Sequence, residues 1–458
     1  MYFPYKHGAT AWLAVAIFAM GFMGVYAFLM VLARAPGFNL LFSDANFFRT
    51  ALVTHVVLAV VIFFIAFIMF MVFYLTGGYP TRKYDYYCAG AALFGIILIV
   101  TTPVFSVAEP MLNNYIPVLN NNQYIAGVIL FFLSVATGSI LRAPEMVNSV
   151  YGLEKYITIA RGTGLILACY TVAMSIVVML LSFVQASEDP DTVYSRIFYE
   201  SGTWGGGHLL QFANTLGMMS AWAILTRKLY KDELIGETAA RWIFVSMGVL
   251  ISITPWMYAK YISIHVYNRL QFTWFKAWGL SYGPIIYALA AARKWGTRKV
   301  VGGYGFVMLG FALSVWLYAL GGVIALMIDG SDTRVPAHYH GVIGAVTIAF
   351  MTIGILAMVE NQRLNVREKW IKTQLAFYGL GQSLFSIGMF IGGTRGLPRK
   401  TFGQEQQLDV LAKKLGMGIM GIGGLLAILA GVVFVVFMIK ALTNKTERES
   451  YDFPCVIK

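Results

Sequence analysis

The sequence alternates long apolar runs with short polar gaps along its whole length. The hydrocarbon core of a bilayer is about 30 Å thick, so about 20 apolar residues cross it as an α-helix. Twelve runs are long enough, at residues 10–34, 48–76, 86–108, 122–142, 159–186, 206–229, 241–266, 271–294, 303–329, 337–361, 371–395 and 414–442. The gaps are too short to fold as soluble domains. The pattern therefore predicts an all-α, polytopic membrane protein with twelve transmembrane helices, in which residues 1–458 form a single domain.

Composition agrees with this pattern and narrows the function. The chain is 59% hydrophobic and 12% charged, whereas a soluble domain carries about 25% charged residues. These values exclude a water-soluble multidomain enzyme and a disordered chain. Its cysteines, Cys88, Cys169 and Cys455, are too few for a disulfide framework, a multi-Cys zinc site or an iron–sulfur site. No CxxCH motif occurs, so we expect no c-type haem on this chain, and the first apolar run lacks the cleavage pattern of a signal peptide.

The basic residues predict the orientation of the helices. With the N-terminus inside, the inner segments hold 22 of the 34 Lys and Arg residues and the outer segments hold ten, while Lys260 and Lys276 fall within spans. Positive residues concentrate on the cytoplasmic side, so both termini are predicted to be cytoplasmic. The net charge of +13 is then mostly a topology signal, and no nucleic-acid partner is expected. Half of the outer charge lies in one segment, at Arg395, Arg399, Lys400, Lys413 and Lys414.

Five of the six histidines form one layer near the outer face, at His55, His208, His265, His338 and His340. Ionisable residues in membrane spans are costly and by default indicate function. A single histidine can be a packing residue, but five from four spans at one depth indicate ligands of metal or haem iron. His338 and His340 are two residues apart and point about 200° apart on a helix, so they cannot share one metal.

These two histidines can instead hold two cofactors, one on each side of the same helix. One cofactor, completed by His55, would be a six-coordinate bis-His haem that carries electrons. The other would be a five-coordinate, high-spin haem whose open position faces His208 and His265. Both haems are expected to be b-type. Outer basic residues suit their propionates, namely Arg399 and Lys400, and also Arg49 and Arg334 beside His55 and His338.

Several motifs together resemble the catalytic subunit of the haem–copper oxidase superfamily over essentially the whole chain. ArgValProAlaHisTyrHisGlyValIleGly (334–344) is similar to the family's motif on span ten, and ArgThrAlaLeuValThrHis (49–55) to its low-spin haem site on span two. GlyLeuProArgLys (396–400) resembles the propionate loop, and TrpGlyGlyGlyHis (204–208) the start of span six. The resemblance implies that His55 and His340 ligate the low-spin haem, that His338 ligates the active-site haem, and that His208 ligates a non-haem metal, iron or copper. The nearest members are the nitric oxide reductase-like and cbb-type enzymes.

The expected ligands of the non-haem metal are incomplete. The family has two adjacent histidines on span seven, whereas this chain has Tyr258, Lys260 and Tyr261 in that region and a single, later His265. Three alternatives remain open: His208, His265 and a further group hold the metal, fewer ligands hold it, or the metal is absent. Gln211 and Asn214 are candidates for a further ligand, with interhelical hydrogen bonds as the alternative role. Lys260 would stabilise an anion at the site or point outward.

The redox-active residues of the family also differ. Oxygen reductases of the common types have a tyrosine four residues after the span-six histidine, and cytochrome c-type nitric oxide reductases have a glutamate there. Phe212 stands at that position, and Leu210 replaces the acidic proton-channel residue. In cbb-type oxidases the tyrosine comes from span seven, where Tyr258, Tyr261 or Tyr267 could serve.

The sequence therefore favours a reductase of nitric oxide to nitrous oxide in a bacterial or archaeal cytoplasmic membrane. Two alternatives remain: a terminal oxygen reductase taking electrons from cytochrome c or quinol, and a haem electron carrier with a degenerate site. Protons are expected from outside, through the acidic loop of Glu188, Asp189, Asp191 and Glu200. Electrons are expected from a small membrane-anchored subunit with a c-type haem or a copper domain, and a quinol donor is the alternative.

Overall fold

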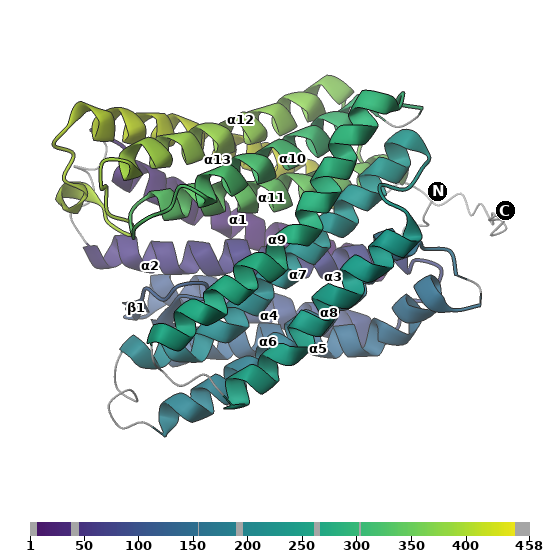
Figure 1. Ribbon diagram of the computed structural model, residues 1–458, viewed down its shortest axis with the longest axis horizontal. Coiled ribbons are helices and arrows are strands. Elements are labelled where there is room, and N and C mark those ends of the chain that lie inside the picture. Colours follow the sequence, from purple (N-terminus) through teal and green to yellow (C-terminus); the bar gives the residue numbers. More distant parts are fainter. Residues whose placement is uncertain are drawn as a thin grey trace.

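Long α-helices lie side by side in the computed structural model (Figure 1), which describes residues 7–37, 45–153, 155–188, 196–260, 266–301 and 304–444. Its α-helices are α1 (His7–Arg34), α2 (Ala45–Val56), α3 (Phe64–Leu75), α4 (Lys83–Phe105), α5 (Asn122–Tyr151), α6 (Ile159–Ser187), α7 (Arg196–Tyr230), α8 (Glu237–Lys260), α9 (Val266–Thr297), α10 (Gly305–Ala325), α11 (Arg334–Glu360), α12 (Glu368–Gly393) and α13 (Leu411–Thr443). The prediction of an all-α membrane protein is confirmed.

Ten of the helices in the described ranges are long and apolar enough to cross a bilayer. α2 and α3 form one of these spans, because the π-helix η2 (Val57–Phe63) joins them without a break. α7 and α9 are also long, with 35 and 32 residues, but they are less apolar and fall outside this set. The number twelve therefore stays a prediction.

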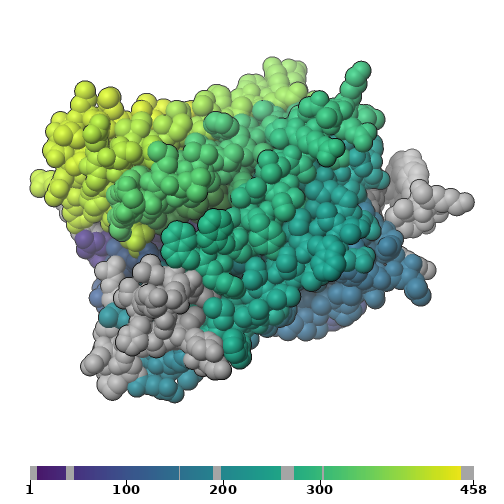
Figure 2. All heavy atoms as spheres, viewed as in Figure 1, coloured from purple at the N-terminus to yellow at the C-terminus, as the bar shows by residue number. Residues whose placement is uncertain are grey.

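Two spans form the centre of the bundle. In Asn46–Leu75 and Arg334–Glu360, 89% and 83% of the most apolar stretch is buried, against 33% to 50% in the other candidate spans. This difference explains why Phe64–Leu75 is apolar on every side: a helix surrounded by other helices has no polar face. α8 and α9 cover the middle of the face seen in Figure 2. They lie at the periphery of the bundle and have four exposed tryptophans, Trp242, Trp256, Trp274 and Trp278.

A short β-hairpin, which the hydropathy pattern does not predict, interrupts the helical fold between α4 and α5. Strand β1 (Glu109–Met111) pairs with β2 (Val118–Asn120) in an antiparallel ladder. Asn121 then caps α5, because its side chain accepts hydrogen bonds from the backbone N–H groups of Gln123 and Tyr124. A one-turn 3-10 helix, η3 (Gly403–Gln406), lies between α12 and α13.

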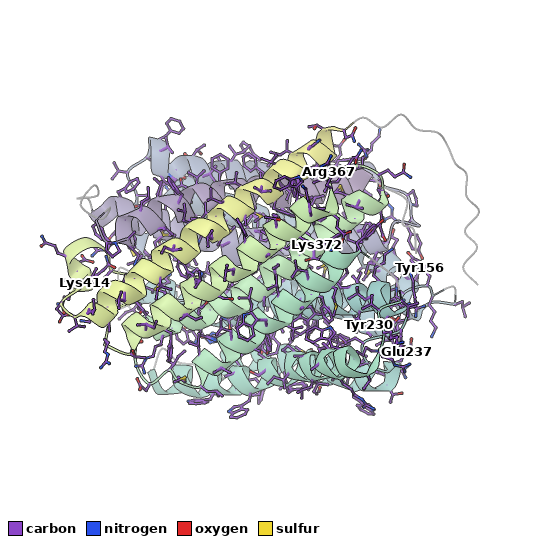
Figure 3. The ribbon with its side chains drawn as sticks, turned by 90° about the horizontal axis from the view of Figure 1, so that it is seen from above. Tyr156, Tyr230, Glu237, Arg367, Lys372 and Lys414 are labelled. Carbon is purple, nitrogen blue, oxygen red and sulfur yellow. The ribbon has the colours of Figure 1, made fainter. Side chains whose placement is uncertain are left out.

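The two ends of the bundle carry different loops. In Figure 3, Lys414 lies at one end, and Tyr156, Tyr230, Glu237 and Arg367 lie towards the other. Asn444, just after α13, donates from its side chain to the carbonyl of Arg363 at 3.1 Å, so α13 ends beside the loop after α11. Segments predicted to be inner thus share one end of the molecule.

Candidate functional site

The start of α11 is fixed to the end of α12 and to the loop that follows it. Thr333, the residue before α11, donates its backbone N–H to Leu397 O at 2.9 Å and its hydroxyl to Met389 O at 2.8 Å. Asp332 forms an isolated antiparallel bridge with Pro398. His338 and His340 therefore stand in the first turns of a helix whose start is tied to the GlyLeuProArgLys loop.

Three imidazoles share one hydrogen-bonding pattern: Nδ1 lies close to a backbone carbonyl oxygen. The pairs are His55 with Met23 at 3.0 Å, His208 with Trp204 at 2.7 Å, and His338 with Gly321 at 2.8 Å. A carbonyl only accepts, so Nδ1 donates its proton and Nε2 keeps its lone pair. This is the tautomer that metal-binding histidines adopt, with the second nitrogen fixed by a neighbour.

Glycines bring the carbonyl acceptor within reach of His338. A Cβ at Gly341 on α11 would lie 2.6 Å from the Cα of Gly321 on α10, so neither position has room for a side chain. Small residues of this kind let the backbones of membrane helices approach closely. The close approach places Gly321 O against the ring of His338.

His55 and His340 come together on one side of α11. They lie near enough for a charge on one ring to act on the other. His55 stands in the last turn of α2, directly before η2, and π-helical segments often occur at functional sites. Asn214 of α7 donates from Nδ2 to Val60 O in η2 at 3.0 Å, so it makes an interhelical hydrogen bond.

The surroundings of His340 fit a haem. Among the residues that the structure describes, Nε and Nη2 of Arg34 and Oε1 of Gln382 are buried without a hydrogen-bond partner. The charge of Arg34 acts on His340, and the centre of the Phe385 ring lies 4.1 Å from the centre of the same imidazole, with the two rings tilted at 43°. A buried, unpaired charge costs several kcal/mol, so an anionic group is expected beside Arg34. A haem propionate supplies such an anion, and the haem iron takes an imidazole on each face.

Aromatic rings pack around His208 on α7. The ring of Tyr115, from the β1–β2 loop, lies 3.9 Å from the ring of His208, and the ring of Trp204 lies 5.1 Å from it. Gly207 leaves the room for Tyr115, because a side chain at that position would collide with the tyrosine. Tyr115 has a φ of 66°, which is uncommon for a bulky residue and costs backbone strain.

Lys276 brings an amino group to the same place. It lies on α9 and is 2% exposed. Its Nζ stands 4.8 Å from the centre of the Phe212 ring, in the geometry of a cation–π contact, and its charge acts on His208. Phe212, four residues after His208, thus packs against a lysine from another helix.

Tyr258, at the end of α8, packs against α7 about one turn before His208. It is 2% exposed, and its ring faces Gly205, where a side chain would collide with it. Gln185 of α6 donates to the carbonyl of Tyr258 at 2.9 Å and so fixes the end of α8.

The loop that carries Tyr115 is clamped from two sides. Lys400 Nζ donates to Leu112 O at 2.5 Å and to Asn114 Oδ1 at 3.3 Å. Glu200 of α7 accepts from the backbone N–H of Asn114 at 2.9 Å and from its Nδ2 at 2.7 Å. Lys400, considered for a propionate, therefore contacts the Tyr115 loop in this structure.

The other basic candidates differ in their partners. Arg334 is paired with Asp332 and Asp329, and its hydrogen bonds lower the pKa of Asp332 although burial opposes this shift. Arg49 pairs with Glu405 at 3.0 Å. Arg399 instead donates to two neutral hydroxyls, Ser331 Oγ at 3.1 Å and Tyr339 OH at 3.3 Å, which leaves its charge uncompensated by these contacts.

Part of the predicted ligand set falls outside the described residues. This applies to His265, Tyr261 and the side chains of Lys260 and Tyr267. In the rest of the chain, no three His, Cys, Asp or Glu side chains converge in a way that suits a metal ion.

Sequence reasoning missed the roles of Arg34, Tyr115, Lys276 and Gln382 at these sites. Lys276 was visible as a lysine inside an apolar run, and Arg34 as a charge at the end of one. Tyr115 and Gln382 give no signal, because their positions depend on contacts between distant segments.

Comparisons with known proteins agree on one family. The family model for cytochrome c and quinol oxidase polypeptide I matches residues 8–427. An uncharacterized protein of Aquifex aeolicus (strain VF5) is 29% identical over 367 residues, which cover 79% of this chain and 88% of that protein. An uncharacterized protein of Rickettsia prowazekii (strain Madrid E) is 25% identical over 482 residues, covering 90% of this chain and 91% of that protein. A solved heme-copper terminal oxidase dimer shares the fold, with a TM-score of 0.71 at 17% identity, over 97% of this chain and 86% of that chain.

Proposed function

This chain belongs to the cytochrome c and quinol oxidase polypeptide I family, and from that premise we propose that it is a nitric oxide reductase. Family membership and the membrane spans make it a multi-pass membrane oxidoreductase that works with haem. In the proposed reaction, two molecules of nitric oxide, two electrons and two protons give nitrous oxide and water. The proposal includes twelve spans with both termini in the cytoplasm.

The histidine layer supplies the haem ligands in this proposal. His55 and His340 hold the low-spin haem, and His338 holds the high-spin haem on the opposite side of α11. Arg34 and Arg399 are the guanidinium groups best placed for propionates, because neither has a carboxylate partner among its contacts in the described residues. A five-coordinate haem, when bound, supplies electrons and a vacant iron position for a small gas molecule.

The contact between Phe212 and Lys276 is the observation that favours nitric oxide over dioxygen as the substrate. Dioxygen cleavage takes four electrons at once, and the family's common oxygen reductases draw one of them from a tyrosine at the position of Phe212. Phenylalanine cannot be oxidised in this way. Coupling of nitric oxide needs two electrons, so it proceeds without that tyrosine. Lys276, buried above the Phe212 ring, stabilises negative charge that develops near His208.

Protons reach the site from the outer face in this proposal. Glu200 holds Asn114, and Tyr115 next to it touches His208, so polar side chains lead from an acidic residue to the site. The electron donor is a small membrane-anchored subunit with a c-type haem or a copper domain, which docks on the same face.

Oxygen reduction is the second candidate, and Tyr258 favours it. This tyrosine comes from α8, as in cbb-type oxidases, and it is buried beside the first turns of the His208 helix. A redox-active tyrosine at this position would replace the one missing at Phe212.

Gas turnover by the purified protein separates these candidates. Reduced protein is supplied with nitric oxide or with dioxygen, and nitrous oxide is measured by mass spectrometry while oxygen uptake is measured with an electrode. Nitrous oxide formation without oxygen uptake is the expected result, and rapid oxygen uptake that is lost in Tyr258→Phe contradicts it. A carbon monoxide difference spectrum without a carbon monoxide-binding haem would identify the protein as an electron carrier instead.

A further inference from the structure

His340 differs from the other described histidines in its neighbours. His55, His208 and His338 each donate to a backbone carbonyl, which no substitution of a side chain can remove. The side chain of Gln382 on α12 lies within hydrogen-bonding reach of His340. The group available to accept a hydrogen bond from this imidazole is therefore a side chain, which a substitution can change.

Gln382 packs against α11 at a glycine, one turn after His340 in the sequence. A Cβ at Gly344 would lie 3.2 Å from Cγ and 3.3 Å from Cβ of Gln382, so the glutamine stem occupies the space that a side chain would need. Gly344 and His340 are four residues apart and share one face of α11. This face directs the amide of Gln382 towards the His340 ring.

The amide has one nitrogen contact and one open oxygen. Nε2 donates to the hydroxyl of Tyr378 at 3.4 Å, one turn earlier on α12. Oε1 is buried and has no hydrogen-bond partner among the described residues. Leaving a buried acceptor unsatisfied costs about 1–3 kcal/mol, so this oxygen needs a donor. The N–H of the adjacent imidazole is a donor of the right chemistry.

We propose that Gln382 positions His340 by accepting its Nδ1–H, and so sets the reduction potential of the haem that His340 holds. The inference rests on the proposed function, because it assumes that Nε2 of His340 ligates the low-spin haem. Hydrogen bonding to the second nitrogen of a ligating histidine fixes its tautomer and raises its basicity. A more basic ligand stabilises ferric iron, which lowers the potential.

Two substitutions at Gln382 therefore move the potential in opposite directions. Gln382→Glu replaces the amide oxygen with a stronger acceptor and lowers the midpoint potential of the low-spin haem. Gln382→Leu removes the acceptor and raises it. Gly344→Ala raises it as well, since the new methyl group displaces the glutamine without changing its chemistry.

Gln374 provides a matched control on the same helix. It is also buried, its Oε1 also lacks a partner among the described residues, and its Nε2 donates to Ala430 O at 3.2 Å. Gln374→Leu is expected to leave the potential unchanged, although it removes the same volume and polarity from α12.

The measurement is a spectroelectrochemical titration of the intact purified protein, read at the low-spin haem band. A wild-type protein without a bis-His low-spin signal in electron paramagnetic resonance would overturn the proposed site. A normal bis-His signal whose potential stays unchanged in both Gln382→Glu and Gln382→Leu overturns the positioning role alone. Equal shifts in Gln382→Leu and Gln374→Leu also overturn it, because they trace the effect to the packing of α12.

Discussion

The two sides of α11 offer opposite environments to histidines that are two residues apart. Around His340, Nε and Nη2 of Arg34 and the amide oxygen of Gln382 are buried without partners in the described residues. Around His208, which faces the His338 side in the proposed arrangement, Tyr115, Trp204 and the Phe212–Lys276 pair fill the space with rings and one cation.

This difference between the two environments corresponds to two functions in the proposed arrangement, electron transfer and gas reduction. The His340 side has the polar groups that a haem would satisfy, as the electron-carrying half of the family requires. The His208 side departs from the family pattern, since a lysine stands near the position where a second metal would lie. We infer that the electron-accepting half is retained in this chain, whereas the gas-reducing half has changed its electrostatics.

Removal of a low-spin ligand has the largest expected effect. His340→Ala or His55→Ala abolishes the low-spin haem and lowers gas turnover by more than about 100-fold, since even a partner of a ligand is worth 10–100-fold. Haem content, measured as the pyridine haemochrome, falls by about half if two haems are bound. His208→Ala is the control from the other side, and it leaves the haem content intact.

His338→Ala tests whether the two sides are independent. We expect loss of carbon monoxide binding and of turnover, while the low-spin absorbance and its potential persist. The reason is that His338 and His340 point to opposite sides of one helix. Loss of both haem signals together, in a protein that still elutes as a folded species, would show that α11 holds a single cofactor.

Neutralising Lys276 has the next largest effect. Lys276→Met keeps the volume but removes the charge, and we expect turnover to fall by about 100-fold, as for other preorganised electrostatic groups. Lys276→Arg keeps the charge and retains most of the turnover. If Lys276 only fills space, methionine raises the melting temperature and leaves turnover at the wild-type level, which contradicts a role in the reaction.

The helices could be predicted because each depends on a short-range pattern. An apolar run long enough to cross a bilayer forms a helix regardless of its neighbours. Thus Gly305–Ala325 and Arg334–Glu360 appear where hydropathy places them. His338 and His340 are two residues apart in sequence, so helical geometry alone predicts that they point in different directions.

The surroundings of the histidines could not be predicted, because they come from distant segments. Tyr115 reaches His208 from a hairpin that lies between two apolar runs, and Lys400 reaches that hairpin across 288 residues. Lys276 meets Phe212 only because α9 crosses α7 at that height (Figure 1). Hydropathy predicts that each helix lies in the membrane, but it does not predict which helices pack against it.

Substitution of Tyr115 has the smallest expected effect and tests the His208 side most finely. The ring holds the imidazole of His208 in place at 3.9 Å, so Tyr115→Ala frees the imidazole and lowers turnover by about 10-fold. Burial, with Tyr339 and Glu200 nearby, raises the pKa of the Tyr115 hydroxyl. This hydroxyl is therefore neutral at every pH below 10, and it contributes no charge to the reaction.

Tyr115→Phe keeps the ring and removes the hydroxyl, so it separates packing from proton transfer. If packing is the role of Tyr115, the phenylalanine variant retains the wild-type turnover and the same pH profile between pH 6 and 9. If the hydroxyl relays protons from Glu200, this variant is slowed as much as Glu200→Gln, and the two substitutions combined slow it no further. The second outcome would make the His208 side a proton entry as well as a gas site, and it would sharpen the contrast with the His340 side.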